Sequence, residues 1–331
     1  MPGYPITRLR RSRMNMFSRA MLTENSILPS DLIWPVFITE GQNIAEPIEG
    51  LTGVDRISLD ILAHRAKMAH RLGIPAIAIF PRIDAALKDD EGSNALASDN
   101  LVCRAIAAIK SAEPDMGVVV DIALDPFTTH GHDGVIRAGV VDNDASLEVL
   151  IKQAVNYARA GSDIVAPSDM MDGRIGAIRA GLDEAGFTQV MIMSYAAKYA
   201  SSLYAPFRAA VSAGALSEIK DKTSYQMNPA NSDEAMREIA LDIKEGADFI
   251  MVKPGMPYLD IIRRSVDQFN IPVFAYQVSG EYQMIQSLAS TLTEDKQKAL
   301  IMEMLISFKR AGCTGILSYF AYQIAEWLNE T

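Results

Sequence analysis

V-M-I-M-S-Y-A-A-K at residues 190–198 and F-I-M-V-K at residues 249–253 are two apolar runs that each end in a lysine. Short apolar runs of this kind are typical of buried strands. Burial disfavours an ammonium group and therefore favours the neutral amines of Lys198 and Lys253. A neutral amine can attack a ketone to form a Schiff base, whereas an ammonium cannot. Two such lysines on consecutive strands predict an enzyme that handles two carbonyl groups.

Similar apolar runs recur on both sides of this pair and alternate with amphipathic helical patterns. The predicted strands are Leu32–Ile38, Ala76–Phe80, Gly117–Leu124, Asp163–Ser168, Val190–Tyr195, Ala247–Val252, Val273–Val278 and Gly315–Phe320. The predicted helices include Leu59–Leu72, Asn94–Ser111, Ala145–Ala160, Arg174–Ala185, Asp233–Glu245, Tyr258–Phe269 and Glu294–Ala311. Strand–helix alternation implies parallel strands joined by right-handed crossovers. Eight such units predict an α/β fold, the (β/α)8 TIM barrel.

Glycines mark where several of these helices end. Five of them follow a helical pattern and shortly precede a strand: Gly73, Gly161, Gly186, Gly246 and Gly312. A glycine there readily adopts the left-handed conformation that ends a helix. The glycines therefore support the predicted alternation and set its phase.

Composition narrows the class of protein. The chain has 331 residues, of which 49% are hydrophobic, and a formal net charge of -10. This charge argues against nucleic acid as a partner, because binding phosphates needs a basic face. Cys103 and Cys313 are far apart and form no C-x-x-C motif, so we expect buried free thiols in a reducing cytoplasm. No apolar run is long enough to span a bilayer, which takes about 18 residues.

The amino-terminal segment is basic. Residues 1–23 contain no acidic residue but five arginines, namely Arg8, Arg10, Arg11, Arg13 and Arg19. No apolar core follows them, so a secretory signal is not supported, whereas a transit peptide is conceivable. We favour an extended arm at residues 1–30 that packs on a neighbouring subunit, with the catalytic barrel at residues 31–331.

One connection is unusually long. Residues 199–231 separate Lys198 from the next helical pattern, and loops of this length in compact domains usually cover a site. We therefore predict an active-site lid. It contains Arg208, Lys220 and Lys222, which would bring positive charge over the mouth of the barrel.

Polar side chains gather at the predicted carboxyl ends of the strands, where TIM barrels carry their active sites. The candidates are Asp121, Asp125, Ser168, Asp169, Lys198, Lys253, Ser279 and Tyr319. If the two ammonium groups lie close together, each lowers the pKa of the other. Arg208, Lys222 and Gln226 in the lid are candidates to bind one carboxylate. Ser279 and Tyr319 are candidates to bind a second carboxylate through their hydroxyls, or ordinary caps of strand ends.

The loop D-P-F-T-T-H-G-H-D-G at residues 125–134 is rich in possible metal ligands. Asp125 and Asp133 could hold a hard cation such as Mg²⁺ or a monovalent ion. His130 and His132 could ligate a transition metal, or could be hydrogen-bonded turn residues.

Four motifs resemble one family. They are M-V-K-P-G-M-P-Y-L-D (251–260), S-Y-A-A-K-Y-A-S-S-L-Y-A-P-F-R (194–208), D-P-F-T-T-H-G-H-D-G (125–134) and Q-V-S-G-E-Y (277–282). They resemble δ-aminolevulinic acid dehydratase, also called porphobilinogen synthase, and the likeness covers nearly the whole chain. The resemblance implies a (β/α)8 enzyme of tetrapyrrole (heme) biosynthesis that condenses two 5-aminolevulinate molecules with loss of two waters.

The resemblance also implies roles for single residues. Lys253 matches the lysine that binds the substrate giving the propionate side, and Lys198 matches the lysine of the acetate side. Arg208, Lys222 and Gln226 match the residues that hold the acetate-side carboxylate. Ser279 and Tyr319 match the residues that bind the propionate-side carboxylate. The basic arm matches a segment that embraces a neighbouring subunit, and the family usually forms a homo-octamer.

One departure from the family pattern concerns metals. Zinc-dependent members carry three cysteines where this chain has Ala123, Asp125 and Asp133, so a thiolate zinc site is not available. The chain resembles the aspartate-rich, magnesium-responsive branch. That likeness implies an allosteric Mg²⁺ at a subunit interface, bound through Glu238. A further cation near Asp125 and Asp133 stays an open possibility.

These observations predict a double Schiff-base mechanism, with Asp121, Asp125 and Asp133 moving protons or orienting the substrate amine. We expect the first substrate to bind at Lys253 and the second at Lys198 as the lid closes. Two alternatives stay open at this point. One is a class I aldolase with a single Schiff-base lysine and a phosphorylated sugar, although no Gly-rich phosphate cradle is evident. The other is a binding module whose lysines only neutralise carboxylates.

Overall fold

Eight parallel strands close into a barrel in this computed structural model, which describes residues 3–211 and 221–330. The barrel strands are β1 (Leu32–Ile38), β4 (Ala76–Pro81), β5 (Gly117–Ile122), β8 (Ile164–Pro167), β9 (Met191–Lys198), β10 (Phe249–Lys253), β11 (Val273–Gln277) and β12 (Gly315–Ser318). They follow one another in chain order, and β12 pairs with β1 to close the ring. The predicted (β/α)8 barrel is confirmed.

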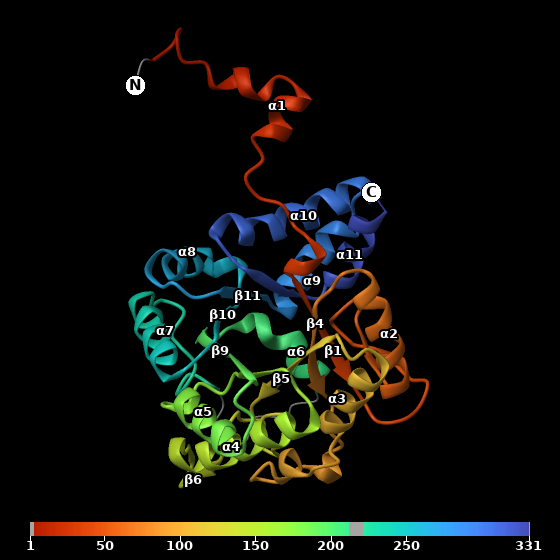
Figure 1. Cartoon of the computed structure of the whole chain (residues 1–331), viewed down its shortest axis with the longest axis vertical. Helices are drawn as coiled ribbons and strands as arrows, with labels where there is room; N and C mark the ends of the chain where they lie inside the picture. Colours follow the sequence, from red (N-terminus) through yellow and green to blue (C-terminus); the bar gives the residue numbers. More distant parts are fainter. Residues whose placement is uncertain (1–2, 212–220, 331) are drawn as a thin grey trace.

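The helices surround the barrel (Figure 1). Their bounds are α2 (Leu59–Arg71), α3 (Leu101–Ala112), α4 (Asn143–Ala160), α5 (Arg174–Glu184), α7 (Asp233–Glu245), α8 (Leu259–Gln268), α9 (Ser279–Ala289), α10 (Glu294–Ala311) and α11 (Ala321–Asn329). The prediction that a helix begins at Asn94 was wrong. A 3-10 turn at Ser93–Leu96 comes first, and Asn100 then caps α3 by accepting a hydrogen bond from the amide of Cys103 at 2.9 Å.

The core consists of strands buried on both faces and of the apolar sides of the helices. Every residue of β1, β4 and β8 is buried, as expected where a parallel sheet is covered by helices. The glycine signals were also correct, since all five of the glycines have positive φ angles: Gly73, Gly161, Gly186, Gly246 and Gly312. Cys103 and Cys313 are buried and free. Within the described ranges, no helix combines the length and apolar character needed to cross a membrane.

Small elements decorate this barrel. The strands β2 (Ala45–Pro47) and β3 (Asp55–Ile57) extend the sheet beside β1, and β6 (Ile136–Arg137) pairs with β7 (Val140–Val141) in a separate hairpin. These pieces lie outside the eight predicted strands and leave the closed ring unchanged.

The connection at residues 199–231 has structure of its own. Tyr199 pairs with Met227, so the two ends of the segment lie side by side. A 3-10 turn at Ser202–Tyr204 leads into α6 (Ala205–Ala210), which packs against α9. Residues 212–220 lie outside the described residues, and with them the predicted lid residue Lys220.

The amino-terminal segment leaves the barrel. It contains a 3-10 helix at Leu9–Arg13 and α1 (Met16–Met21), and it projects away from the strands (Figure 1). Large apolar side chains on it are exposed, including Met16 at 80%, Met21 at 79% and Phe17 at 67%. Clusters of exposed apolar side chains are typical of surfaces that contact another molecule.

Candidate active site

Lys198 and Lys253 are the last residues of β9 and β10, and they are register partners across these adjacent parallel strands. The predicted end of the fifth strand at Tyr195 was therefore too early, because pairing with β10 carries β9 on to Lys198. Both side chains are buried, with 5% of Lys198 and 6% of Lys253 exposed. Neighbouring strands thus place two amines together at the carboxyl end of the barrel.

Aromatic rings surround the amine of Lys253. Its Nζ lies 4.7 Å from the ring centre of Tyr276, 4.9 Å from Tyr195, and 5.3 Å from both Tyr204 and Phe207. Burial, reinforced by the nearby Lys198 ammonium, lowers the pKa of Lys253 to about 7. A substantial fraction of this amine is therefore neutral at physiological pH.

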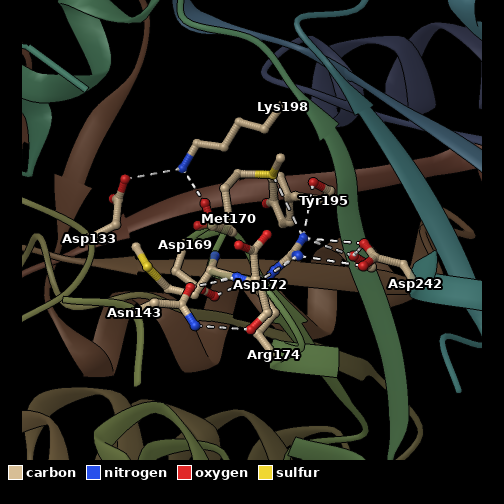
Figure 2. Close-up of polar contacts among 12 residues, drawn as sticks. Asp133, Asn143, Asp169, Met170, Asp172, Arg174, Tyr195, Lys198 and Asp242 are labelled. Atoms are coloured by element: carbon tan, nitrogen blue, oxygen red, sulfur yellow. Dashed lines mark hydrogen bonds and ion pairs between the residues drawn. The ribbon is translucent and has the colours of Figure 1, made fainter. Parts of the chain in front are cut away.

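Lys198 has polar neighbours instead. Its Nζ lies 3.6 Å from Oδ2 of Asp133 and donates a hydrogen bond to the carbonyl oxygen of Ser168. Figure 2 shows Lys198 pointing toward Asp133. Lys198 is therefore held by a carboxylate and a backbone carbonyl, whereas Lys253 is surrounded by rings.

Asp125 and Asp133 share a third buried lysine, Lys222. Lys222 Nζ lies 3.0 Å from Asp133 Oδ1 and 3.3 Å from Asp125 Oδ2. Burial raises the pKa of Asp125. Burial acts in the same direction on Asp133, but Lys198 and Lys222 outweigh it and hold the pKa of Asp133 well below its usual range. Asp133 is therefore the ionised carboxylate at the centre of the cluster.

Asp121 is the third carboxyl group of the cluster. Burial raises the pKa of Asp121 to about 6, although Lys253 and Lys198 act in the opposite direction. Its Oδ1 is buried and has no hydrogen-bond partner among the described residues. A carboxyl group with a pKa close to neutrality can both donate and accept a proton at physiological pH.

A single small cavity joins these groups to the lid segment. Its volume is about 30 Å³, room for about one water molecule, so little open space remains in the site. The lining residues are Asp121, Asp125, Asp133, Ser168, Lys198, Tyr204, Phe207, Arg208, Lys222, Gln226 and Lys253. The predicted lid residues Arg208, Lys222 and Gln226 thus meet both lysines. Gln226 also has a buried Oε1 atom without a hydrogen-bond partner in the described part of the chain.

Ser279 and Tyr319 are not among the residues that line this cavity. The Ser279 hydroxyl accepts a hydrogen bond from the amide of Phe207 at 3.0 Å and donates one to the Leu203 carbonyl at 3.3 Å. The Tyr319 and Tyr276 hydroxyls are 2.9 Å apart. In this arrangement the two predicted carboxylate ligands are engaged with protein atoms.

Asp169 does not point into the cavity, so its assignment to the site was wrong. Its carboxylate lies 3.7 Å from Arg174, whose guanidinium also contacts Asp242 at 3.3 Å (Figure 2). All three side chains are buried, and together they join the β8 loop to α7. Sequence reasoning took Asp169 for a site residue because it follows a strand end, but the buried guanidinium of Arg174 draws it away.

The predicted metal ligands differ in how well they suit a cation. His130 contacts Asp90 O through one ring nitrogen at 3.1 Å and His132 N through the other at 3.2 Å, as a hydrogen-bonded turn residue does. Asp125 and Asp133 already share the Lys222 ammonium, which occupies the place of a cation. Across residues 3–211 and 221–330 no group of three or more His, Cys, Asp or Glu side chains is arranged to hold a metal.

Glu238 has surroundings that suit a cation better. It lines a cavity of about 420 Å³ together with Glu234 and Asp172. Burial raises the pKa of Glu238, and Asp242, Asp172 and Glu234 add repulsion between like charges. A divalent cation would relieve this repulsion, and one carboxylate with several waters is a common arrangement for Mg²⁺.

Sequence reasoning missed the aromatic wall and one acid behind it. Tyr195, Tyr204, Phe207 and Tyr276 come from three different parts of the chain, and only the fold brings them around Lys253. Glu281, which is 2% exposed, contacts the turn after Lys253. Its presence within the quoted motif Q-V-S-G-E-Y was the only available signal.

Comparison with known proteins gives one consistent family. The family model described as Delta-aminolevulinic acid dehydratase matches residues 6–327. The Delta-aminolevulinic acid dehydratase of Bradyrhizobium diazoefficiens is 54% identical over 321 residues, covering 97% of this chain and 90% of that protein. That of Halalkalibacterium halodurans is 47% identical over 323 residues, covering 98% and 97%. The crystal structure of delta-aminolevulinic acid dehydratase (porphobilinogen synthase) from Toxoplasma gondii ME49, in complex with the reaction product porphobilinogen, has a TM-score of 0.94 at 42% identity, covering 98% of this chain and 92% of that one.

Proposed function

This chain belongs to the δ-aminolevulinic acid dehydratase family, and we propose that it makes porphobilinogen from two 5-aminolevulinate molecules through imines on Lys253 and Lys198. As a member of the family it is a lyase of tetrapyrrole biosynthesis. The observation that carries the proposed mechanism is the register pair of buried lysines, which opens on one cavity with three aspartates.

Lys253 acts as the first nucleophile. With a pKa of about 7, its amine is partly neutral and attacks the ketone of the substrate that supplies the propionate side. Lys198 captures the ketone of the second substrate, and each imine formed releases one water. The enamine derived from the Lys198 imine attacks the imine carbon on Lys253, which forms the carbon–carbon bond.

Ring closure uses the amino group of the substrate on Lys253. This amine attacks the imine carbon on Lys198 and expels the Lys198 amine, which forms the carbon–nitrogen bond. Loss of the Lys253 amine and of a ring proton then gives the aromatic pyrrole. The balance is two 5-aminolevulinate molecules in and one porphobilinogen with two waters out.

The aspartates divide the proton transfers according to their pKa values. Asp121, with a pKa of about 6, is suited to take and return protons, and Asp125 shares that role. Asp133 stays ionised between Lys198 and Lys222 and orients the amines. A closed cavity excludes water, which protects the imines from hydrolysis.

Two sets of residues bind the substrate carboxylates. Arg208, Lys222 and Gln226 bind the carboxylate of the acetate-side substrate. Two observations support a rearrangement of these side chains when substrate enters: Gln226 Oε1 has no hydrogen-bond partner in the described part of the chain, and Lys222 is shared between Asp125 and Asp133. Ser279 and Tyr319 bind the carboxylate of the propionate-side substrate. For this, Ser279 exchanges its bond with the Phe207 amide for one with substrate as the lid segment at residues 199–231 opens.

The family is metal-dependent, and for this chain we propose an allosteric Mg²⁺ held by Glu238 and water molecules. Magnesium titration of the wild type and of Glu238→Ala tests this assignment, with calorimetric binding as a readout independent of activity. Retention of wild-type Mg²⁺ binding in Glu238→Ala would remove it.

The amino-terminal arm at residues 1–30 mediates assembly with further copies of this chain, most simply a homo-octamer in the cytoplasm. Its exposed side chains Met16, Phe17 and Met21 support this role. Mass photometry of the full chain beside a variant lacking residues 2–22 tests it, and an unchanged assembly size contradicts it.

The activity itself has a direct test. The purified full-length protein is incubated with 5-aminolevulinate and Mg²⁺, and the product is detected with Ehrlich's reagent, which colours pyrroles. In parallel, borohydride reduction attaches substrate covalently, and peptide mass spectrometry locates it. We expect colour, together with label on Lys253. Absence of both favours a binding module, whereas label on one lysine without pyrrole favours a class I aldolase.

A further inference from the structure

Glu281 is a buried acid to which the reaction described above gives no role. Only 2% of it is exposed, and within the described part of the chain its carboxylate has no cationic partner within ion-pairing distance. Burial raises the pKa of Glu281 to about 7, although hydrogen bonds from three backbone amides oppose that shift. A buried acid held by backbone amides alone must contribute through the backbone that it binds.

Those three amides belong to two different turns. Oε2 accepts hydrogen bonds from Val278 N at 2.7 Å and from Gly255 N at 3.2 Å. Oε1 accepts another from Met256 N. The Gly255–Met256 turn comes directly after Lys253, and Val278 directly precedes Ser279. One carboxylate therefore ties the strand end that carries Lys253 to the strand end that carries Ser279.

The rest of the Lys253 backbone is fixed as well. Its carbonyl oxygen accepts hydrogen bonds from Tyr199 N at 2.9 Å and from the Tyr204 hydroxyl at 3.1 Å. Glu281 holds the turn that follows Lys253 through the amides of Gly255 and Met256. Without this acid, two backbone amides after Lys253 would lose their acceptor in a dry environment.

We propose that Glu281 is a positioning residue that fixes the separation between the Lys253 amine and the Ser279 hydroxyl, and so selects the chain length of the keto acid bound there. The inference rests on the proposed function, in which these two groups hold the ketone and the carboxylate of one substrate. Glu281 acts through position and not through charge. The pKa of Lys253 is set by burial, Lys198 and the aspartates Asp121, Asp125 and Asp133.

Glu281→Gln tests the proposal with almost no change in shape. The amide keeps one acceptor oxygen but turns an NH2 group toward backbone donors, so at least one of the three hydrogen bonds is lost. With 5-aminolevulinate and borohydride, we expect the trapping rate at Lys253 to fall at least tenfold. Trapping at Lys198, read from its own peptide in the same digest, should stay within twofold of wild type.

A matched control lies at the other end of β10, the strand that ends in Lys253. Asp248 directly precedes β10, and its carboxylate accepts a hydrogen bond from Ile192 N at 2.7 Å. Asp248→Asn thus removes a carboxylate that holds a backbone amide of β9, but far from the lysines. We expect trapping within twofold of wild type at both lysines, even where the melting temperature falls.

A second readout is the preference of Lys253 for keto acids of one chain length, which a general loss of stability would leave unchanged. Trapping at Lys253 is measured with 4-oxopentanoate and with 5-oxohexanoate, which is longer by one methylene. We expect wild type to prefer 4-oxopentanoate, and Glu281→Gln to lower that preference at least fivefold. Glu281→Asp, which draws the carboxylate back by one carbon, should act in the same direction and serves if the Gln variant does not fold.

The outcomes separate this inference from the function on which it rests. Wild type that traps substrate on neither lysine removes the proposed function, and this inference with it. Wild type that traps normally, beside a folded Glu281 variant with unchanged Lys253 trapping or unchanged chain-length preference, overturns the inference alone. Equal losses at Lys198 and Lys253 also overturn it, because they show a purely structural role.

Discussion

Lys253 and Lys198 face each other across one strand pair, yet their surroundings differ in kind. Four aromatic rings enclose the Lys253 amine, whereas Lys198 lies beside Asp133 and donates to a backbone carbonyl. Burial lowers the pKa of Lys253 to about 7. The difference teaches that two lysines matched in sequence and register can be prepared for different steps, one as a neutral nucleophile and one as an ion-paired partner.

The largest expected effect tests the nucleophile. Lys253→Arg keeps a cation of similar length, but a guanidinium stays protonated and forms no imine. We expect the rate of porphobilinogen formation to fall by about 10⁴-fold or more, as when other covalent nucleophiles are removed. Lys244→Arg, on the exposed face of α7, is the control and should retain wild-type activity.

Trapping experiments then distinguish the two lysines. Lys198→Arg should lose turnover yet keep borohydride trapping at Lys253, because the first imine needs only the neutral amine. If Lys198→Arg abolishes trapping at Lys253 while Lys253→Arg leaves trapping at Lys198 intact, the assigned difference is reversed.

The next largest effect is expected from Asp133, which pairs with Lys198 and Lys222. Asp133→Asn leaves Lys198 and Lys222, both buried, with Asp125 as their remaining carboxylate at this end of the cluster. Removing one partner of a buried ion pair typically costs about 3–5 kcal/mol of unfolding free energy. We expect a loss of that size in urea denaturation at fixed protein and Mg²⁺ concentration.

Asp125→Asn should cost less stability than Asp133→Asn. Burial raises the pKa of Asp125, so replacing its carboxylate by a neutral amide costs less free energy. Asp133, in contrast, is held ionised by two lysines. A greater loss for Asp125→Asn than for Asp133→Asn would contradict the central place given to Asp133.

How far the sequence predicts this molecule depends on the range of the interactions. The barrel was predictable, because each strand is a short, mostly buried run and several helices end in a local glycine signal, such as Gly161 or Gly246. The failed start at Asn94 has a local cause too, since Asn100 caps α3 only after a separate 3-10 turn.

The candidate site was predictable only as far as position along a strand determines it. The cavity lining includes Lys198, Lys253 and Asp121, all of which stand at or near strand ends. Partner choice is a matter of tertiary contacts. Asp169 pairs with Arg174, which also contacts Asp242 of α7, 68 residues further along the chain. The aromatic wall around Lys253 likewise exists only in the folded barrel.

A smaller effect is expected from pH. Lys253 attacks as the neutral amine, and its pKa is about 7 because burial and Lys198 outweigh Asp121, Asp125 and Asp133. Below this pKa the reactive fraction falls about tenfold per pH unit, and above it the fraction reaches a plateau. We expect the initial rate of imine trapping at Lys253 by cyanoborohydride, corrected for the reaction of a free peptide lysine, to rise between pH 6 and pH 8. A rate that rises only above about pH 10, as for an ordinary lysine, would contradict the neutral-amine assignment.

The smallest expected effect tests the rings themselves. An aromatic face stabilises an ammonium by about 0.5–2 kcal/mol, so we expect the ring of Tyr276, 4.7 Å from Nζ, to act on the pKa of Lys253 in the direction opposite to burial. Tyr276→Leu removes that ring and should move the midpoint of the trapping profile about half a pH unit lower, since one pH unit corresponds to about 1.4 kcal/mol. Tyr276→Phe keeps the ring, loses only the hydroxyl bonded to Tyr319, and should leave the midpoint in place. If Tyr276→Leu instead admitted water to the site, the midpoint would move upward, because a better-solvated ammonium has a higher pKa. A midpoint that moves upward in Tyr276→Leu would therefore show that the rings act at Lys253 by excluding water and not by binding the cation.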